Sequence, residues 1–439
     1  MISFNFFLRN ALYLSIFAVY LWFMKTFAPL GIDWLPFHSN RVSNFIEYLE
    51  INGYVTNFGF SIWTECQDCD LKLDKWDSKI YFSGHALMFS PYIFLTYFFG
   101  IESVPVLGPW VDRIVIFLTS LLLSEFLIKA FKNHSNFSDL FIGIGAFSIF
   151  ISSPWVYKMI LAGWTEIYFA FFFMCGLLLI SNKSYLIGYI FTAIAALFNP
   201  TWALVTSVFY ILMACLPYFF HENKDFFRSF YPSKNFSKRS KFILVGSLLM
   251  PALFIMIIKV IASGLVGSND GSSILFRVGI SGFDIHNGGI LGALQFLGGN
   301  RISHCLAGSY TDLPLNNMES LIGSYNCIFS ISGMWILSVF GFIGSILLIK
   351  NNKYTHYLFV PLMFSLVWLF SVFQQSFSVH LMGYSYIFAI FFTAGMAFWF
   401  TRFSIKFSSQ TLSIIFLSPI LAAIVIMSIR VSMLTGVNG

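Results

Sequence analysis

Charged side chains are scarce in this sequence: Asp, Glu, Lys and Arg make up only 10% of its 439 residues, against roughly 25% in a typical soluble domain. This shortage excludes a water-solvated globule. It also excludes nucleic-acid-binding and disordered chains, because both need far more charge. Apolar residues take the place of the missing charge, at 58% of the chain with 56 Phe among its aromatic residues. The composition indicates a polytopic membrane protein.

The sequence also lacks an A-x-A-like cleavage site after its first apolar run, which follows Arg9 and extends from Ala11 to Met24. A secretory signal peptide would end at such a site, so the pattern indicates a retained signal anchor. No internal repeat, low-complexity tract or heptad pattern is visible. Because apolar runs are spread almost from end to end, we expect residues 1–439 to form a single integral membrane domain.

Eleven apolar runs approach the roughly 20 residues that a membrane-spanning helix requires. They lie near residues 6–30, 110–131, 138–157, 164–181, 184–198, 201–220, 241–264, 329–349, 356–374, 383–401 and 411–431. The run at 184–198 is short, and Asn199-Pro200 ends its helical pattern. The further segment 85–99 is shorter than a span, which suits an interfacial or re-entrant helix better.

The positions of the charged residues favour one path through the membrane. If the N-terminus is inside and 85–99 does not span, Lys129, Lys132 and the basic loop 221–241 fall on the inner side. Counting 85–99 as a span would place them outside, against the positive-inside rule. We therefore expect an all-α polytopic membrane protein with about 11 transmembrane helices and a C-terminus outside. Two large outer loops, 31–109 with juxtamembrane helices and 265–328, complete this arrangement. Residue usage favours a bacterial inner (plasma) membrane.

Few cysteines are present, and four of the six fall in the two outer loops: Cys66, Cys69, Cys305 and Cys327. An even number on the outer side suits an oxidising compartment, so these four are disulfide candidates. The Cys66-x-x-Cys69 pair has two other interpretations: its cysteines are free thiols, or they form half of a metal site. No second pair of ligands at metal spacing is apparent, and we assign no metal ligands.

The first outer loop places an acid directly after the first span. Asp33 precedes Trp34 at the expected membrane–water boundary, and Arg41 follows a few residues later. One interpretation makes Asp33 a general base whose pKa partial desolvation raises. The other makes it an ordinary helix-capping or interfacial residue. Residues 42–49 have a helical apolar pattern, which predicts a helix lying flat on the membrane.

The second outer loop carries Gly-rich turns and the bases Arg277 and Arg301. Because Arg matches a phosphate bidentately, these two are candidates for a phosphate clamp. His380, between the expected ninth and tenth spans, would reach the same side. The turns match neither a P-loop nor a dinucleotide-binding fingerprint, and the chain contains no zincin motif and no Ser–His–Asp pattern.

Ionisable residues at span ends are candidate functional groups because burying them in a membrane is costly. Glu166 begins the expected span at 164–181, and Lys158 lies at the same outer edge. A substrate contact and a structural ion pair are equally open for Glu166. Lys259 can extend its ammonium group toward the outer interface and needs no special role.

The order of these features resembles the GT-C superfamily of integral membrane glycosyltransferases, which includes protein O-mannosyltransferases and lipid A aminoarabinose transferases. Four segments carry the resemblance, all of them within residues 1–220. They are Asp33 after the first span, Gly84-His85 through Pro91-Tyr92 to Phe99-Gly100, Ser153-Pro154 with Gly163 to Glu166, and Ala195 to Thr201.

The resemblance implies transfer of a sugar from a polyprenyl-phosphate donor to a lipid, protein or glycan acceptor on the outer face. It implies that Asp33 is the catalytic base and that 85–99 is a juxtamembrane helix. The Lys-Pro-Pro of many members is replaced by Ser83-Gly84-His85-Ala86, so His85 becomes a candidate for the donor-phosphate contact. No cofactor is indicated; a divalent metal stays an open alternative, although the acidic pair of metal-dependent members is absent after the first span. A transporter or flippase, and a non-catalytic member of the same fold, are the alternative functions.

Overall fold

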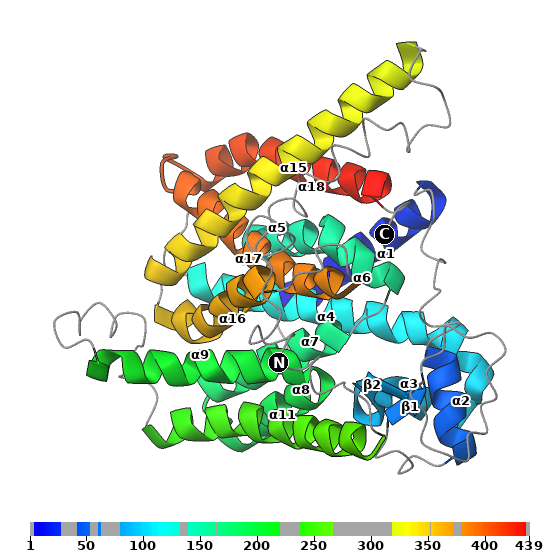
Figure 1. Ribbon diagram of the computed structural model, residues 1–439. Helices are drawn as coiled ribbons and strands as arrows, with labels where there is room; N and C mark the ends of the chain where they lie inside the picture. Colours follow the sequence, from blue (N-terminus) through cyan, green and yellow to red (C-terminus); the bar gives the residue numbers. More distant parts are fainter. Residues whose placement is uncertain are drawn as a thin grey trace. The chain divides into compact units, whose positions relative to one another are not determined.

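The computed structural model describes residues 4–27, 42–52, 60–62, 80–131, 139–162, 165–219, 238–266, 318–351, 353–372 and 379–435. These residues are almost all helical (Figure 1). Six helical segments are long and apolar enough to cross a membrane by themselves. They are Leu8–Phe27, Ile101–Phe131, Phe242–Ile261, Ser332–Ile349, Ser385–Ser404 and Gln410–Met433. The chain is therefore a helical protein with the features of an integral membrane protein, as its composition predicts.

In each apolar run expected from the sequence, the residues that the structure describes are helical, apart from Ser153 and Ser184. The longer helices are α1 (Phe4–Phe27), α4 (Val104–Phe131), α11 (Lys238–Val266), α15 (Met318–Asn351), α16 (Lys353–Val372), α17 (Val379–Ser404) and α18 (Gln410–Thr435). The shorter ones are α5 (Asp139–Ser152), α6 (Pro154–Ala162), α7 (Thr165–Ser181), α8 (Tyr185–Phe198) and α9 (Pro200–Phe219).

Proline explains two of the breaks between consecutive helices. The expected break after 184–198 is present, since α8 ends at Phe198 and Pro200 begins α9. The expected single helix at 138–157 is wrong: α5 ends at Ser152, and a new helix, α6, begins at Pro154. Proline has no N–H to continue the hydrogen-bond ladder and disfavours a helical residue before it, so it stands at the first position of both new helices.

The described helices group into two compact units. Unit 1 comprises residues 1–33, 117–158 and 284–439, and unit 2 comprises residues 34–116 and 159–283. The first half of α4 belongs to unit 2 and the second half to unit 1. The two units are described separately below.

Close helix contacts through glycine hold unit 1 together. Helices α15 and α17 pack against each other, and a side chain at Gly395 would overlap the carbonyl oxygen of Gly341. Beside this crossing the indole nitrogen of Trp399 donates to the carbonyl of Phe340 at 2.9 Å. Helix α5 packs against α1, α17 and α18. Such close backbone contacts are typical of helix packing in membranes, where small residues replace the missing hydrophobic driving force.

Unit 2 combines helices with short surface elements. Helices α7, α8, α9 and α11 pack against one another (Figure 1). The first loop contributes α2 (Ser43–Asn52) and an antiparallel pair of strands, β1 (Phe60–Ile62) and β2 (Ile80–His85). The sequence predicts the helix but not the strands. Ile46 and Leu49 of α2 are fully buried. Burial of these two residues is what an amphipathic helix with one apolar face predicts.

A short helix follows the strands in unit 2. The chain continues through η3 (Ala86–Phe89) into α3 (Ser90–Phe99), and η4 (Ile101–Ser103) then leads into α4. Gly100 separates α3 from η4 with a φ of 79°, in the left-handed region that glycine tolerates. At 1.5 Å per residue, α3 is about 15 Å long, half the thickness of a bilayer core. This length agrees with the expectation that 85–99 does not span.

Candidate functional site

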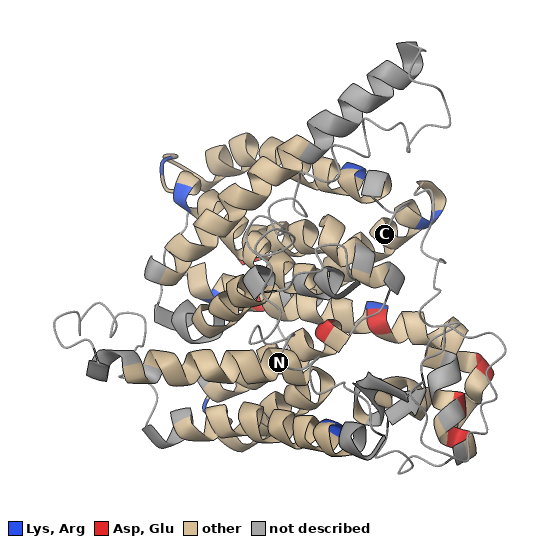
Figure 2. Cartoon of the chain, viewed as in Figure 1, with Lys and Arg blue, Asp and Glu red and all other residues tan. Residues whose placement is uncertain are grey.

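The most informative feature of unit 2 is that it contains buried charges. Among the described residues, the charged side chains that are buried are Asp112, Arg113, Glu166 and Lys259, with exposed fractions of 1 to 5%. All four belong to unit 2. They are two acids and two bases, so their formal charges balance. Figure 2 shows that most of the described helical residues are uncharged.

Asp112 is held by two phenols that come from distant parts of the chain. The hydroxyl of Tyr92 in α3 and the hydroxyl of Tyr168 in α7 each donate to Oδ1 of Asp112 at 2.6 Å. This distance is typical of charge-assisted O–H···O⁻ hydrogen bonds. We call Tyr92, Asp112 and Tyr168 the Asp112 cluster. It joins α3, α4 and α7 at one carboxylate oxygen.

Burial and charge keep the Tyr92 phenol in its donating form. Desolvation, and then the negative charge of Asp112, raise the pKa of Tyr92 well above its ordinary value. The ring of Tyr92 also packs edge-to-face against that of Tyr168, with centroids 6.3 Å apart. The cluster is therefore fixed by ring packing as well as by hydrogen bonds.

A second polar group lies where two helices begin. Asn199 donates through Nδ2 to Oε1 of Glu166 at 3.0 Å and to Oγ1 of Thr165 at 3.2 Å. Its Oδ1 accepts from the backbone N–H of Trp202 at 3.1 Å, which caps the first turn of α9. Glu166 lies in the first turn of α7, where the helix dipole favours a negative charge. We call Thr165, Glu166 and Asn199 the Glu166 cluster.

Aromatic stacking connects the two clusters. The ring of Tyr168 stacks on Phe198 at 4.9 Å, and Phe198 directly precedes Asn199. Tyr168 itself is two residues after Glu166 on α7. The polar groups of both clusters thus lie around the N-terminal end of α7, within one unit.

The two buried bases have different surroundings. The guanidinium of Arg113 lies over the ring of Trp110, 4.6 Å from its centroid, in a cation–π contact. Lys259, which the sequence allows to extend toward the outer interface, has a buried side chain in unit 2. On α11 the neighbouring Ile257, Val260 and Ile261 are about half exposed, whereas Lys259 lies on the buried side of the helix with Ile255.

The structure brings one residue of the predicted site into these clusters, namely Glu166. Asp33, Arg41, Arg277 and Arg301 lie outside the described residues, as do Cys66, Cys69 and Cys305. The backbones of His85, at the end of β2, and His380, in the first turn of α17, are described, but their side chains are not. The same holds for Cys327 in α15 and for Lys158 in α6, the alternative partner of Glu166.

Sequence reasoning gave no role to Tyr92, Tyr168 or Asn199. Tyr92 and Asn199 lie within segments that carry the family resemblance, which was the available signal for them. For Asp112 the signal was an acid inside an apolar run, which is a functional candidate by default. Nothing in the spacing of these residues indicates that they meet.

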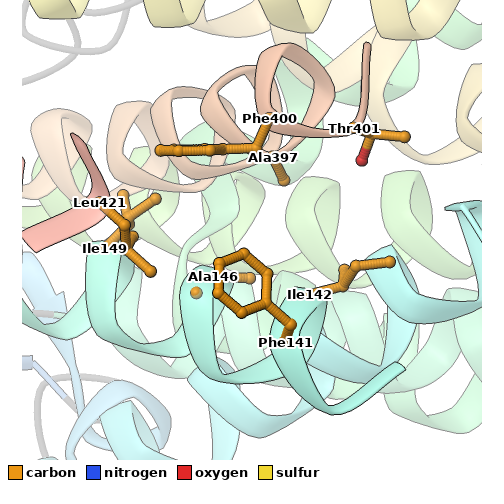
Figure 3. A pocket seen from close by; sticks show the side chains of 9 residues that line it. Phe141, Ile142, Ala146, Ile149, Ala397, Phe400, Thr401 and Leu421 are labelled. Carbon is orange, nitrogen blue, oxygen red and sulfur yellow. The ribbon is translucent and has the colours of Figure 1, made fainter. Parts of the chain in front are cut away.

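Two further features of the described residues carry no candidate chemistry. Within the described ranges, no three His, Cys, Asp or Glu residues are grouped so as to hold a metal ion, and Cys175 and Cys215 are free thiols. In unit 1 a cavity of about 20 Å³ lies among α5, α17 and α18 (Figure 3). Its lining is apolar apart from Thr401, and it is large enough for little more than one water molecule.

Comparison of the chain with models of protein families, with characterised proteins and with solved structures finds no match in any of the three.

Proposed function

We propose that this chain is a membrane glycosyltransferase of the GT-C type. It would transfer a sugar from a polyprenyl-phosphate donor to a lipid, protein or glycan acceptor at the outer face of a bacterial inner membrane. The observation that carries the proposal is a convergence in unit 2. Three of the four segments that carry the family resemblance supply Tyr92, Glu166 and Asn199, and these residues belong to two adjoining buried polar clusters.

The expected path through the membrane supports the same placement. With eleven spans and an inner N-terminus, Asp112, Glu166 and Asn199 all belong to outer helix ends, next to the loop that holds Asp33. Polyprenyl-phosphate donors are long apolar lipids with a charged head. A buried, charge-balanced group beneath an outer loop suits the head of such a lipid, while its chain stays in the membrane.

In the proposed reaction the acceptor hydroxyl attacks the anomeric carbon of the donor sugar. Asp33 takes the hydroxyl proton, and the bond between the anomeric carbon and the phosphate oxygen breaks. The polyprenyl phosphate leaves with the electron pair, and its charge is stabilised by Arg301, Arg277 or His85. Arg41, Glu166 and His380 are proposed to contact the substrates.

The experiment that tests this function measures release of free polyprenyl phosphate by the purified protein from a panel of pentose- and hexose-linked donors. We expect Asp33→Asn to lower turnover by roughly 10²–10⁴-fold, which is the usual contribution of a general base. Glu102→Gln is the matched control, because Glu102 is an exposed acid in the same expected outer loop, 31–109. Near-normal turnover of Asp33→Asn, with the wild type active, would remove Asp33 from the mechanism.

A transporter or flippase is the second candidate, and one observation favours it. Within the described ranges, proline begins a new helix directly after another at Ser153-Pro154 and at Asn199-Pro200, and Asn199 of the second break belongs to the Glu166 cluster. Broken helices often form the substrate site of transporters. Donor lipid that moves across a reconstituted bilayer with its sugar intact would support this function. Binding of polyprenyl phosphate without sugar release or movement would indicate a non-catalytic member of the fold.

A further inference from the structure

We propose that Asp112 is a positioning residue: by accepting both phenol hydrogen bonds it fixes α3 against α4 and α7, and so holds the His85 segment in place for the donor. The effect on the donor rests on the proposed function, whereas the anchoring of α3 does not. The argument starts from the Asp112 carboxylate.

A carboxylate with 1% exposure needs donors, because an isolated buried charge is strongly unfavourable. The two phenols meet this need at a single oxygen, each 2.6 Å away. Hydrogen bonds constrain direction as well as distance, which ring packing alone does not. The carboxylate therefore sets how α3 is placed relative to α7.

Helix α3 has few other attachments to the rest of unit 2. Its buried residues are Tyr92, Leu95 and Thr96. Thr96 bonds within the helix, to the carbonyl of Ile93. The opposite face is aromatic and exposed, with Phe94, Tyr97, Phe98 and Phe99 at 57–83%. Tyr92 is thus the described residue of α3 that supplies a polar contact to another helix.

Two candidate site residues are close in sequence to the two phenols. His85 is at the end of β2, and only η3 and two residues of α3 separate it from Tyr92. Glu166 is two residues before Tyr168 on α7. One carboxylate oxygen therefore joins the chain segments that carry His85 and Glu166. Release of Tyr92 would allow the His85 segment to move relative to α7.

The first arm of the test follows α3 itself and needs no activity. The full chain, with its six native cysteines replaced by alanine, carries a single cysteine at Leu95, which is buried, or at Tyr97, which is exposed. A membrane-impermeant maleimide reports access. Asp112→Asn keeps an accepting oxygen but removes the charge that strengthens both phenol hydrogen bonds. We expect it to raise the labelling rate at position 95 about ten-fold and to leave position 97 unchanged. Equal protection of position 95 in Asp112→Asn and the parent would overturn the proposal.

The second arm measures sugar transfer with the variants Asp112→Asn, Asp112→Glu and Tyr92→Phe/Tyr168→Phe. We expect Asp112→Asn to raise KM for the donor about ten-fold with little change in kcat, and Asp112→Glu to restore part of the loss. In a His85→Ala background the same change at Asp112 should have no further effect, since it acts through His85. Additive losses, or a fall in kcat alone, would overturn the positioning role. An inactive parent chain would count against the proposed function, while the labelling arm would still decide whether Asp112 anchors α3.

Discussion

Asn199 offers the sharpest test of the described site, because one side chain joins a helix cap to a buried carboxylate. Replacing it with alanine removes the cap on Trp202 N–H and the two hydrogen bonds to Glu166 and Thr165. Loss of a helix cap costs about 1 kcal/mol. Loss of a hydrogen bond to a charged group costs about 1.5–3 kcal/mol. We therefore expect Asn199→Ala to lower the free energy of unfolding by about 2–4 kcal/mol.

Asn199→Asp separates these two contributions. The new carboxylate still has an oxygen for the Trp202 N–H, so the cap is kept. It also places a second acid next to Oε1 of Glu166, where the amide nitrogen now lies at 3.0 Å. Two carboxylates this close do not both ionise readily. We expect Asn199→Asp to resemble the wild type near pH 5, where the pair can hold a proton, and to be clearly less stable at pH 8.

The assay is thermal unfolding of the purified protein in detergent, measured at both pH values. Ser184→Ala is the matched control, since Ser184 occupies the cap position of α8 and makes no side-chain capping bond. It should unfold like the wild type. If Asn199→Ala also unfolds like the wild type, or if Asn199→Asp shows no dependence on pH, the assigned hydrogen bonds of the Glu166 cluster are wrong.

Two further predictions concern packing and pH. Gly395→Ala should destabilise unit 1 by about 1–3 kcal/mol or more, because its methyl group would overlap the Gly341 carbonyl. Gly246→Ala is the control and should not destabilise the protein, since the space around Gly246 is open. Equal melting temperatures for the two variants would contradict the close crossing of α15 and α17. The stability that Tyr92 adds should be present below pH 10, where an unfolded phenol is still protonated, and should fall above it, because the pKa of Tyr92 is raised in the folded protein. The check is to measure the free energy of unfolding of wild type and Tyr92→Phe from pH 7 to 11 and to follow the difference between them. Tyr97→Phe, at an exposed position, is the control. A difference that stays constant to pH 11 would contradict it.

Much of the helical architecture follows from the sequence, because apolar length is a local property. The runs at 241–264 and 411–431 correspond to α11 and α18 with only a few residues added at each end. The break at Pro200 could also be predicted. The break at Pro154 could not be predicted from hydropathy, because the apolar character of 138–157 continues on both sides of it. Hydropathy does not depend on whether a residue has a backbone N–H.

The candidate site could be predicted only in part, because its contacts are not local. Tyr92 and Tyr168 reach Asp112 across 20 and 56 residues of sequence, and no periodicity relates such positions. Glu166 was identifiable because it begins a span. The direction of Lys259 depends on which face of α11 is turned toward the protein, and a helix that is apolar on most sides does not reveal that.

The two units differ in what they bury, and this difference bears on where chemistry takes place. Each charged residue at the centre of a membrane helix costs about 2.5–3.5 kcal/mol on insertion scales. Among the described residues, unit 1 buries no charged side chain; it is held by apolar contacts, close glycine crossings and the partly exposed ion pair between Arg9 and Glu125. Unit 2 buries four, although apolar residues at those positions would satisfy packing at lower cost. Asp112 accepts hydrogen bonds from Tyr92 and Tyr168, and Glu166 accepts one from Asn199. Both acids lie near segments that carry predicted site residues. A balanced set of buried charges suits a charged lipid head, which is why we propose that Glu166 and the His85 segment of unit 2 contact the donor.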